Sequence, residues 1–275
     1  MPGEAGFTFG RAESIGANTA NSLAVTVTAS GTANAYGSWA TLGTTTFEHN
    51  SIIVYAIRGS AAADYVLDLG IDDGAGNVFV IAGSLRAPNQ KAADYGYSYA
   101  LPLRVPAGKA LVARVACNTA SASILVSVTG MSRGPRGITG YSRCLPLYTA
   151  ATSRGVTVDP GGTANTKGSW AQLVASTAFE TAAVMLCVGH NADSSRTAAA
   201  SALLDIGVGS AGNEFALIPN IPLGWTTTSD TPVPAVVGPF ECCIPQGRRV
   251  AARMQCTDTT AGDRTIDVGA WAFVP

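Results

Sequence analysis

The sequence predicts an all-β protein made of two tandem, duplicated, jelly-roll-like β-sandwich domains, joined by a linker that contains glycine and arginine. Three observations lead to this prediction: a long internal repeat, short segments in which apolar and polar residues alternate, and turns rich in glycine, proline and asparagine between those segments. Short alternating segments separated by such turns are typical of sandwiches and barrels. About seven or eight strands in each repeat would suit a jelly roll.

The internal repeat is the strongest of these signals. Residues 31–40 (GTANAYGSWA) and 162–171 (GTANTKGSWA) are identical at eight of ten positions, 131 residues apart. Further along, Leu67–Gly70 matches Leu204–Gly207, and the order of the matches is kept. Such a duplication decides the domain organisation before any motif is interpreted. We therefore divide the chain into an N-terminal docking segment (1–30), a first sandwich repeat (31–131), a linker with an added strand (132–160) and a second sandwich repeat (161–275).

The strand prediction rests on the period of the apolar residues. Residues 23–28 and 124–129 alternate apolar and hydroxyl side chains, and residues 51–57 and 183–188 are apolar runs of strand length. Residues 155–160 also alternate, which predicts the added strand within the linker. No window keeps a helical period long enough to predict a helix.

The composition excludes several classes of partner. Only 13% of the residues are charged, and 17 Lys and Arg against 18 Asp and Glu give a net charge of −1. A binder of nucleic acid would need a basic excess, and the apolar runs are far shorter than the roughly 20 residues that a membrane-spanning helix needs. We therefore expect neither nucleic acid nor membrane as a partner. A net charge near zero favours association, which predicts a homo-oligomer.

Candidate catalytic groups are few. The histidines are His49 and His190, and no Gly-x-Ser-x-Gly elbow accompanies them. Asp68 and Asp205 occupy equivalent places in the two repeats, which favours a role in the fold, such as binding turn amides at a strand end. The acidic turn after Asp68 lacks the spacing of an EF-hand loop. We expect no catalytic residue, no metal ion and no cofactor; a glycan hydrolase that uses Asp68 or Asp205 is the alternative with the least support.

Other repeated residues also point to the fold. Trp39 and Trp170 are equivalent, each follows Gly-Ser, and their apolar neighbours predict that both lie in the core. The alternative is that they stack on sugar rings, since indole faces suit such contacts. Arg114 and Arg253 occupy equivalent places in matching strands.

The places where the repeats differ are candidates for binding. Tyr95, Tyr97 and Tyr99 lie at period two and would share one face of a strand, and Trp225 lies in the corresponding stretch of the second repeat. These aromatic residues are candidate contacts for a partner or a glycan, with packing at an edge strand as the alternative. Candidate docking residues in and near the linker are the arginines Arg133, Arg136, Arg143 and Arg154.

One set of motifs carries a resemblance. The segment 203–214 (LLDIGVGSAGNE), with 218–220 (IPN), 244–253 (IPQGRRVAAR) and the Gly-Ser-Trp element that ends at Trp170, resembles a module of tailed-bacteriophage virion proteins, among them minor tail, particle and head-surface proteins. The first repeat departs from this pattern at Asp72-Asp73, where the module has Gly-Ser.

The resemblance implies a location in the virion, after synthesis in the cytoplasm of the bacterial host, and other virion subunits as partners. We expect a non-enzymatic structural protein on the particle surface, as a head decoration, fibre or tail component. The alternative is an attachment protein of a tail fibre that binds a host-surface glycan.

Overall fold

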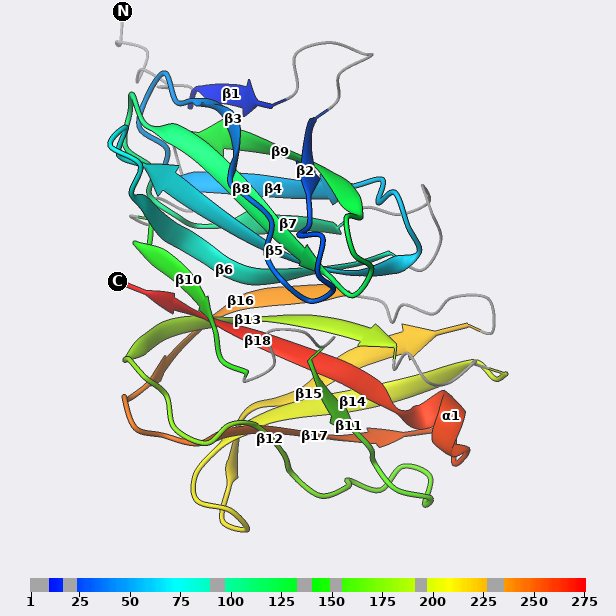
Figure 1. Ribbon diagram of the computed structural model, residues 1–275. Helices are drawn as coiled ribbons and strands as arrows, with labels where there is room; N and C mark the ends of the chain where they lie inside the picture. Colours follow the sequence, from blue (N-terminus) through cyan, green and yellow to red (C-terminus); the bar gives the residue numbers. More distant parts are fainter. Residues whose placement is uncertain are drawn as a thin grey trace, which may run out of the picture.

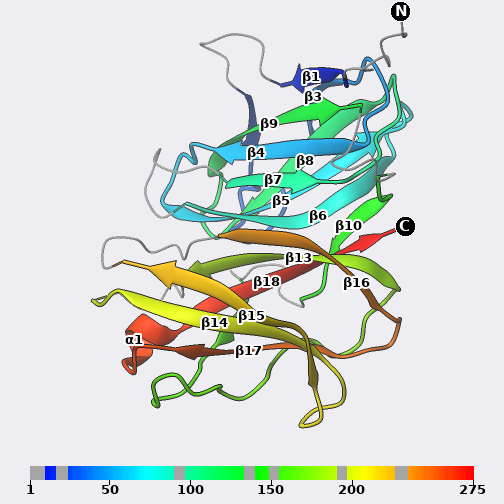
Figure 2. The same cartoon turned by 180° about the vertical axis from the view of Figure 1, so that it is seen from behind.

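The computed structural model confirms the all-β prediction. It describes residues 10–16, 24–89, 97–132, 140–148, 155–190, 197–226 and 235–275, which form strands and one short helix (Figure 1). Two sandwiches lie one above the other, and the chain passes from the upper to the lower at β10 (Figures 1 and 2). We call β1–β9 the first module and β10–β18, with α1, the second module.

The first module is a sandwich of two sheets. One sheet has the order β1-β9-β4-β7, with β2 also paired to β9, and the other has the order β6-β5-β8-β3. The strands are β1 (Ala12–Ile15), β2 (Val25–Thr28), β3 (Ala40–Thr44), β4 (Ser51–Ile57), β5 (Ala63–Asp72), β6 (Val78–Asn89), β7 (Tyr97–Leu101), β8 (Ala110–Cys117) and β9 (Ser123–Met131).

The second module repeats this strand order. The sheet β10-β18-β13-β16, with β11 also on β18, corresponds to β1-β9-β4-β7 with β2, and β15-β14-β17-β12 corresponds to β6-β5-β8-β3. The elements are β10 (Arg143–Pro146), β11 (Val156–Val158), β12 (Ala171–Val174), β13 (Thr181–His190), β14 (Ala200–Val208), β15 (Phe215–Trp225), β16 (Val236–Ile244), β17 (Val250–Cys256), α1 (Ala261–Arg264) and β18 (Ile266–Val274).

The duplicated unit is therefore longer than the repeat found in the sequence. Strands β1 and β2 belong to the first sandwich, although the sequence set residues 1–30 apart as a docking segment. Likewise β10 and β11, from the stretch expected as a linker, both pair with β18. Ile15 is the last residue of β1, and Leu147 directly follows β10. Each is buried in the core of its own module.

The two modules are joined by a continuous sheet, in which a strand from the expected linker takes part. Strand β10 pairs antiparallel with β18 and parallel with β6 of the first module, through Cys144 and Ala82. Nine strands thus belong to one sheet that crosses both modules. Residues 133–139 and 149–154 of the linker lie outside the described residues.

Strand β18 is buried on both faces. Val268, Ala270 and Ala272 belong to the core of the second module, whereas Trp271 and Phe273 pack with the core of the first. Because successive side chains of a strand point to opposite faces, one apolar strand contributes to both cores. The continuously apolar end of the sequence is typical of such a strand.

Candidate functional site

The most clearly duplicated feature is an ion pair on the outer face of each module. Asp68 in β5 lies directly opposite Arg114 in β8, and Asp205 in β14 lies directly opposite Arg253 in β17. Arg114 donates to Oδ2 of Asp68 at 2.9 Å from Nε and 2.8 Å from Nη2, and Nε of Arg253 lies 3.0 Å from Oδ2 of Asp205. These residues alternate with core residues, so they point away from the cores.

The second oxygen of each aspartate binds a backbone amide of the neighbouring strand. The amides of Ser84 and Asn220 each donate to Oδ1 of their aspartate at 2.8 Å. Both residues have a positive φ, 54° and 55°, at an irregularity in the strand pairing. The aspartates therefore hold a bulge of the neighbouring strand in place, whereas the duplication predicted a role in the fold through turn amides at a strand end.

In the second module a lysine adds to this arrangement. Lys167 donates to Oδ1 of Asp205 at 2.7 Å and to the carbonyl of Leu203 at 3.0 Å. Burial alone would raise the pKa of Asp205, but the hydrogen bonds from Lys167, from the Asn220 amide and from Arg253 together lower it. Asp205 is a permanently charged anchor at neutral pH.

The two repeated tryptophans complete these clusters. The guanidinium carbons of Arg114 and Arg253 lie 4.5 and 4.4 Å from the ring centres of Trp39 and Trp170. A Cβ at Gly207 would stand 2.5 Å from Cη2 of Trp170, so the glycine of the repeated motif makes room for the indole.

The expectation that Trp39 and Trp170 lie in the core was wrong: both are half-buried on the outer face. An arginine that stacks on an indole shields it from solvent without placing it in the core. The apolar neighbours in the sequence do not distinguish this arrangement from burial in the core.

Tyr36 distinguishes the first cluster from the second. Its ring centre lies 4.4 Å from the guanidinium carbon of Arg114, so that this group contacts both Tyr36 and Trp39. The Tyr36 hydroxyl donates to Oδ1 of Asp68 at 3.1 Å. Burial, followed by the nearby Asp68 charge, raises the pKa of Tyr36, so the phenol stays neutral. Sequence reasoning missed Tyr36, because lysine occupies its place in the second repeat.

A groove of about 640 Å³ adjoins this first cluster. It runs between β2 and the segment that leads into β3. Gly37 permits this close approach, because a Cβ there would collide with the carbonyl oxygen of Thr28. None of the described residues that line the groove is charged; they offer two aromatic rings, several hydroxyls and backbone groups. The lining residues are Thr26, Thr28, Ala29, Ser30, Gly31, Tyr36, Gly37, Ser38, Trp39 and Ala40.

The corresponding place in the second module is used differently. Asp159 and Gly162 are the counterparts of Thr28 and Gly31 at the same spacing of 131 residues. Arg264 of helix α1 pairs with Asp159, at 2.7 Å from Nε and 3.1 Å from Nη2. Its Nη1 would lie 3.9 Å from a Cβ on Gly162. An ion pair therefore lies where the first module has hydroxyls.

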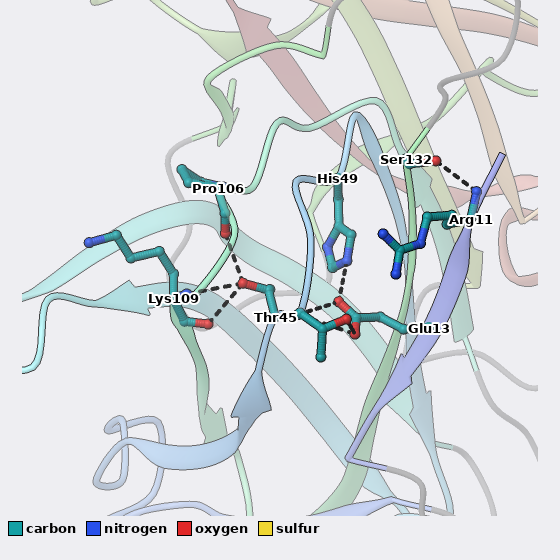
Figure 3. A network of polar contacts seen from close by, with 8 residues as sticks. Arg11, Glu13, Thr45, His49, Pro106, Lys109 and Ser132 are labelled. Atoms are coloured by element: carbon teal, nitrogen blue, oxygen red, sulfur yellow. Dashed lines mark hydrogen bonds and ion pairs between the residues drawn. The ribbon is translucent and has the colours of Figure 1, made fainter.

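His49 belongs to a separate polar network beside β1 (Figure 3). Its ring is fully buried, and Nε2 lies 2.6 Å from Oε1 of Glu13. Glu13 also accepts hydrogen bonds from the amide and the hydroxyl of Thr46, at 2.9 and 2.5 Å. Burial would raise the pKa of Glu13, but the bonds from Thr46 and His49 lower it. The network fastens β1 to the loop before β4, consistent with a structural His49. The side chain of His190 is outside the described part of the structure.

The candidate aromatic contacts do not form an exposed row. Tyr97 and Tyr99 share one face of β7, as their spacing predicted, but that face points inward: their exposed fractions are 7% and 0%. Trp225 is also buried, at 4%. The prediction that these three residues contact a partner or a glycan was wrong. For the tyrosines, period two shows that they share a face of the strand, but it does not show which face is covered. Tyr95 lies outside the described residues.

Of the candidate docking arginines, only Arg143 lies in the described part of the chain; Arg133, Arg136 and Arg154 lie outside it. Nε of Arg143 donates to the carbonyl of Val80 at 3.0 Å, and its guanidinium carbon lies 4.8 Å from the ring centre of Phe79. Arg143 therefore binds β10 to β6 within the chain.

Two kinds of site can be checked over the described residues. No group of three or more His, Cys, Asp or Glu side chains there is placed to hold a metal ion. Nor is any helix in those ranges long and apolar enough to cross a membrane.

Comparison with known proteins gives a distant likeness of architecture. No family model matches the sequence, and no curated protein matches it. Among solved structures, PNGF-II in its C2 crystal form is 7% identical, with a TM-score of 0.36, over 86% of this chain and 59% of its own. The tandem CBM22-1–CBM22-2 domain of Paenibacillus barcinonensis Xyn10C is 11% identical, with a TM-score of 0.29, over 98% of this chain and 92% of its own. The chain thus spans less than two thirds of the length of PNGF-II.

Proposed function

We propose that this protein is a non-enzymatic structural protein on the surface of a tailed-phage virion, and that its first module binds a neutral glycan of the host surface. The observation that carries the binding function is the groove beside β2, with Tyr36 and Trp39 on a fixed support and hydroxyl groups around them. The virion location rests on the sequence resemblance alone.

The chemistry of the groove favours a sugar. Aromatic rings offer apolar faces to the C–H groups of a sugar ring, and Trp39 is held in place by Arg114. The hydroxyls of Thr26, Thr28 and Ser38 can exchange hydrogen bonds with sugar hydroxyls. Preorganised contacts of this kind reduce the entropic cost of binding. Because the described residues that line the groove carry no charge, we expect an uncharged glycan as the ligand, with an affinity that depends little on salt.

The acidic residues support a non-enzymatic role. Asp68 and Asp205 are held by arginines and by bulge amides, and Glu13 is held by Thr46 and His49. A glycosidase needs two carboxyl groups that face one substrate. Asp68 and Asp205 belong to different modules and serve the same local purpose in each, which does not favour a hydrolase.

The groove predicts the outcome of a matched pair of substitutions. Trp39→Ala should weaken binding of neutral glycans on an array by about tenfold or more, because it removes the aromatic face of the groove. Trp170→Ala removes the equivalent indole and its stacking on Arg253, but leaves the groove intact, and should bind as the wild type does. The array compares both variants with the wild-type protein and includes acidic glycans.

Two results would contradict this assignment. Equal binding by the wild type and the Trp39 variant would remove the groove from the proposal. Preference for acidic glycans would contradict the neutral ligand. Thermal unfolding of both variants checks that any loss is not caused by misfolding, since both lose the same structural contact.

The association predicted from the composition has its own measurement. Light scattering behind a sizing column should give a mass that is a multiple of 27.9 kDa, because a surface with few charges offers little repulsion between copies. A mass of a single chain at all concentrations would contradict the homo-oligomer.

A further inference from the structure

The outer face of the sheet β1-β9-β4-β7 in the first module is largely apolar. Strands β4 and β9 turn Ile52, Val54 and Val126 into the core, so the residues between these lie on the outer face. The other outer residues of the sheet's strands are alanine, serine or threonine. The described strands therefore place no charged side chain on this face. Its large apolar side chains, all half-buried, are Ile53, Tyr55, Ile57, Leu125 and Met131.

In the second module the corresponding face is an interface. Strands β13 and β18 correspond to β4 and β9, and their outer residues Met185, Trp271 and Phe273 pack with the core of the first module. Both strands lie at the top of the lower module, beneath the first (Figures 1 and 2). Ile53 is the counterpart of Met185, because each follows the repeated Phe-Glu pair by five residues. The duplicated face is thus covered by protein in one module, while its side chains stay partly exposed in the other.

Another copy of the chain does not offer the first module the same kind of partner. Within the chain, the face of the second module meets the edge of the first, where β10 pairs with β6. The corresponding edge strand of the second module is β15, which contains Pro219 and Pro222. Proline donates no backbone hydrogen bond to a further strand. The β15 edge of another copy is therefore a poor acceptor for β1, the counterpart of β10, and a different surface fits this face better.

We propose that this face binds the same face of a second copy and makes the protein a dimer with two-fold symmetry. The inference rests on the self-association proposed above and names its surface. An isologous contact brings identical patches together, and a face without charged side chains brings no like charges together. Two sheets that pack face to face bury such side chains as they do within a sandwich.

Tyr55 is the anchor of the proposed contact. It lies directly opposite Ser98 of β7 on one side and Ser127 of β9 on the other, so its ring stands between two small side chains. In the dimer, the ring of each copy packs over the serines of its partner, and tyrosine is enriched among the residues that dominate binding energies. Because β9 lies between β4 and β2, the contact is centred away from the groove beside β2.

The dimer predicts a wild-type mass of twice 27.9 kDa in light scattering behind a sizing column. Tyr55→Lys should raise the dissociation constant of the dimer by about a hundredfold or more, because the symmetric contact holds each substitution twice and would bury two unpaired charges. Tyr55→Phe should remain a dimer. Phe215→Lys introduces the same charge at a phenylalanine of β15 that is 60% exposed and lies outside the face, and it should also remain a dimer.

Ser98→Arg covers the case in which Tyr55→Lys does not fold. Ser98 is exposed, so the single chain should accommodate arginine, whereas the dimer should separate. Glycan binding is measured on the same samples, so that a failed dimer is distinguished from a failed groove. A dimer that survives both substitutions, or one that Phe215→Lys separates, would overturn this surface but keep the self-association. A single-chain mass for the wild type at all concentrations would overturn both.

Discussion

Replacement of Trp271 by alanine is expected to lower the free energy of unfolding by about 3–5 kcal/mol, the usual cost of removing a buried tryptophan. Trp271 is fully buried and lies edge-on to Tyr99 and Tyr148, with ring centres 6.2 and 5.3 Å apart. Its Nε1 donates to the carbonyl of Gly83 in β6 at 2.9 Å. One side chain of the second module therefore fills the core and satisfies the backbone of the first.

The same substitution should change the cooperativity of unfolding. The wild type should unfold in one transition, because the modules share a nine-stranded sheet and Trp271 packs with the first core. Without the indole the contact between the modules weakens, and calorimetry should show two transitions.

Trp271→Phe is the matched control for this loss. It keeps an aromatic ring and removes the bond to Gly83, so it should cost less than alanine and keep one transition. A loss within about 0.5 kcal/mol for Trp271→Ala, the usual range for surface substitutions, would contradict the role of Trp271 at the junction.

The sequence predicted the fold class and the duplication, because both depend on local patterns. Alternation and turns are visible within a few residues, and the repeat preserves the residues of the outer cluster, such as Asp68, Gly70 and Arg114. The junction was not predictable in this way. The strands β1 and β10 share too few identical residues to align, and their equivalence appears only from their pairing with β9 and β18.

The burial of individual aromatic residues could not be predicted from the sequence either. Tyr99 reads as a surface residue beside Ser98, yet its face is covered because Trp271 and Cys187 approach it from the second module. Trp39 reads as a core residue, yet it lies half-buried on the outer face, where Arg114 covers its ring. Both errors have one cause: the covering group lies far away in the sequence.

The edge strands β6 and β15 differ in whether they can pair with a further strand. In the first module, β6 accepts β10 beside Gly83 and carries Arg86 across the junction. The counterparts of these residues in β15, aligned through Ser84 and Asn220, are Pro219 and Pro222. Proline cannot donate a backbone hydrogen bond and is common at edges that must not pair. The edge of β15 is therefore protected from the strand addition that β6 permits.

Asp205→Asn is expected to lower the free energy of unfolding by about 3 kcal/mol at neutral pH, near the lower end for breaking a buried ion pair because Lys167 and Arg253 are partly exposed. The Asp205 side chain itself is 3% exposed and holds these two cations and the bulge amide of Asn220. The substitution leaves both cations without a counter-charge. Urea unfolding measures the loss.

The pH dependence of the free energy of unfolding also tests the Asp205 carboxyl group, and the direction of the effect is defined. The pKa of Asp205 is lowered in the folded protein, so its contribution is fully present above the unfolded pKa, about 3.9, and is lost as the pH falls through the lower folded value. The difference in the free energy of unfolding between the wild type and Asp205→Asn should therefore shrink only in strong acid.

The equivalent residue of the first module provides the matched comparison. Asp68 faces one cation, Arg114, and the neutral hydroxyl of Tyr36, so Asp68→Asn should cost less than Asp205→Asn. Equal losses from the two variants would show that the bulge amides, which both aspartates bind at 2.8 Å, and not the second cation, determine what these carboxylates contribute.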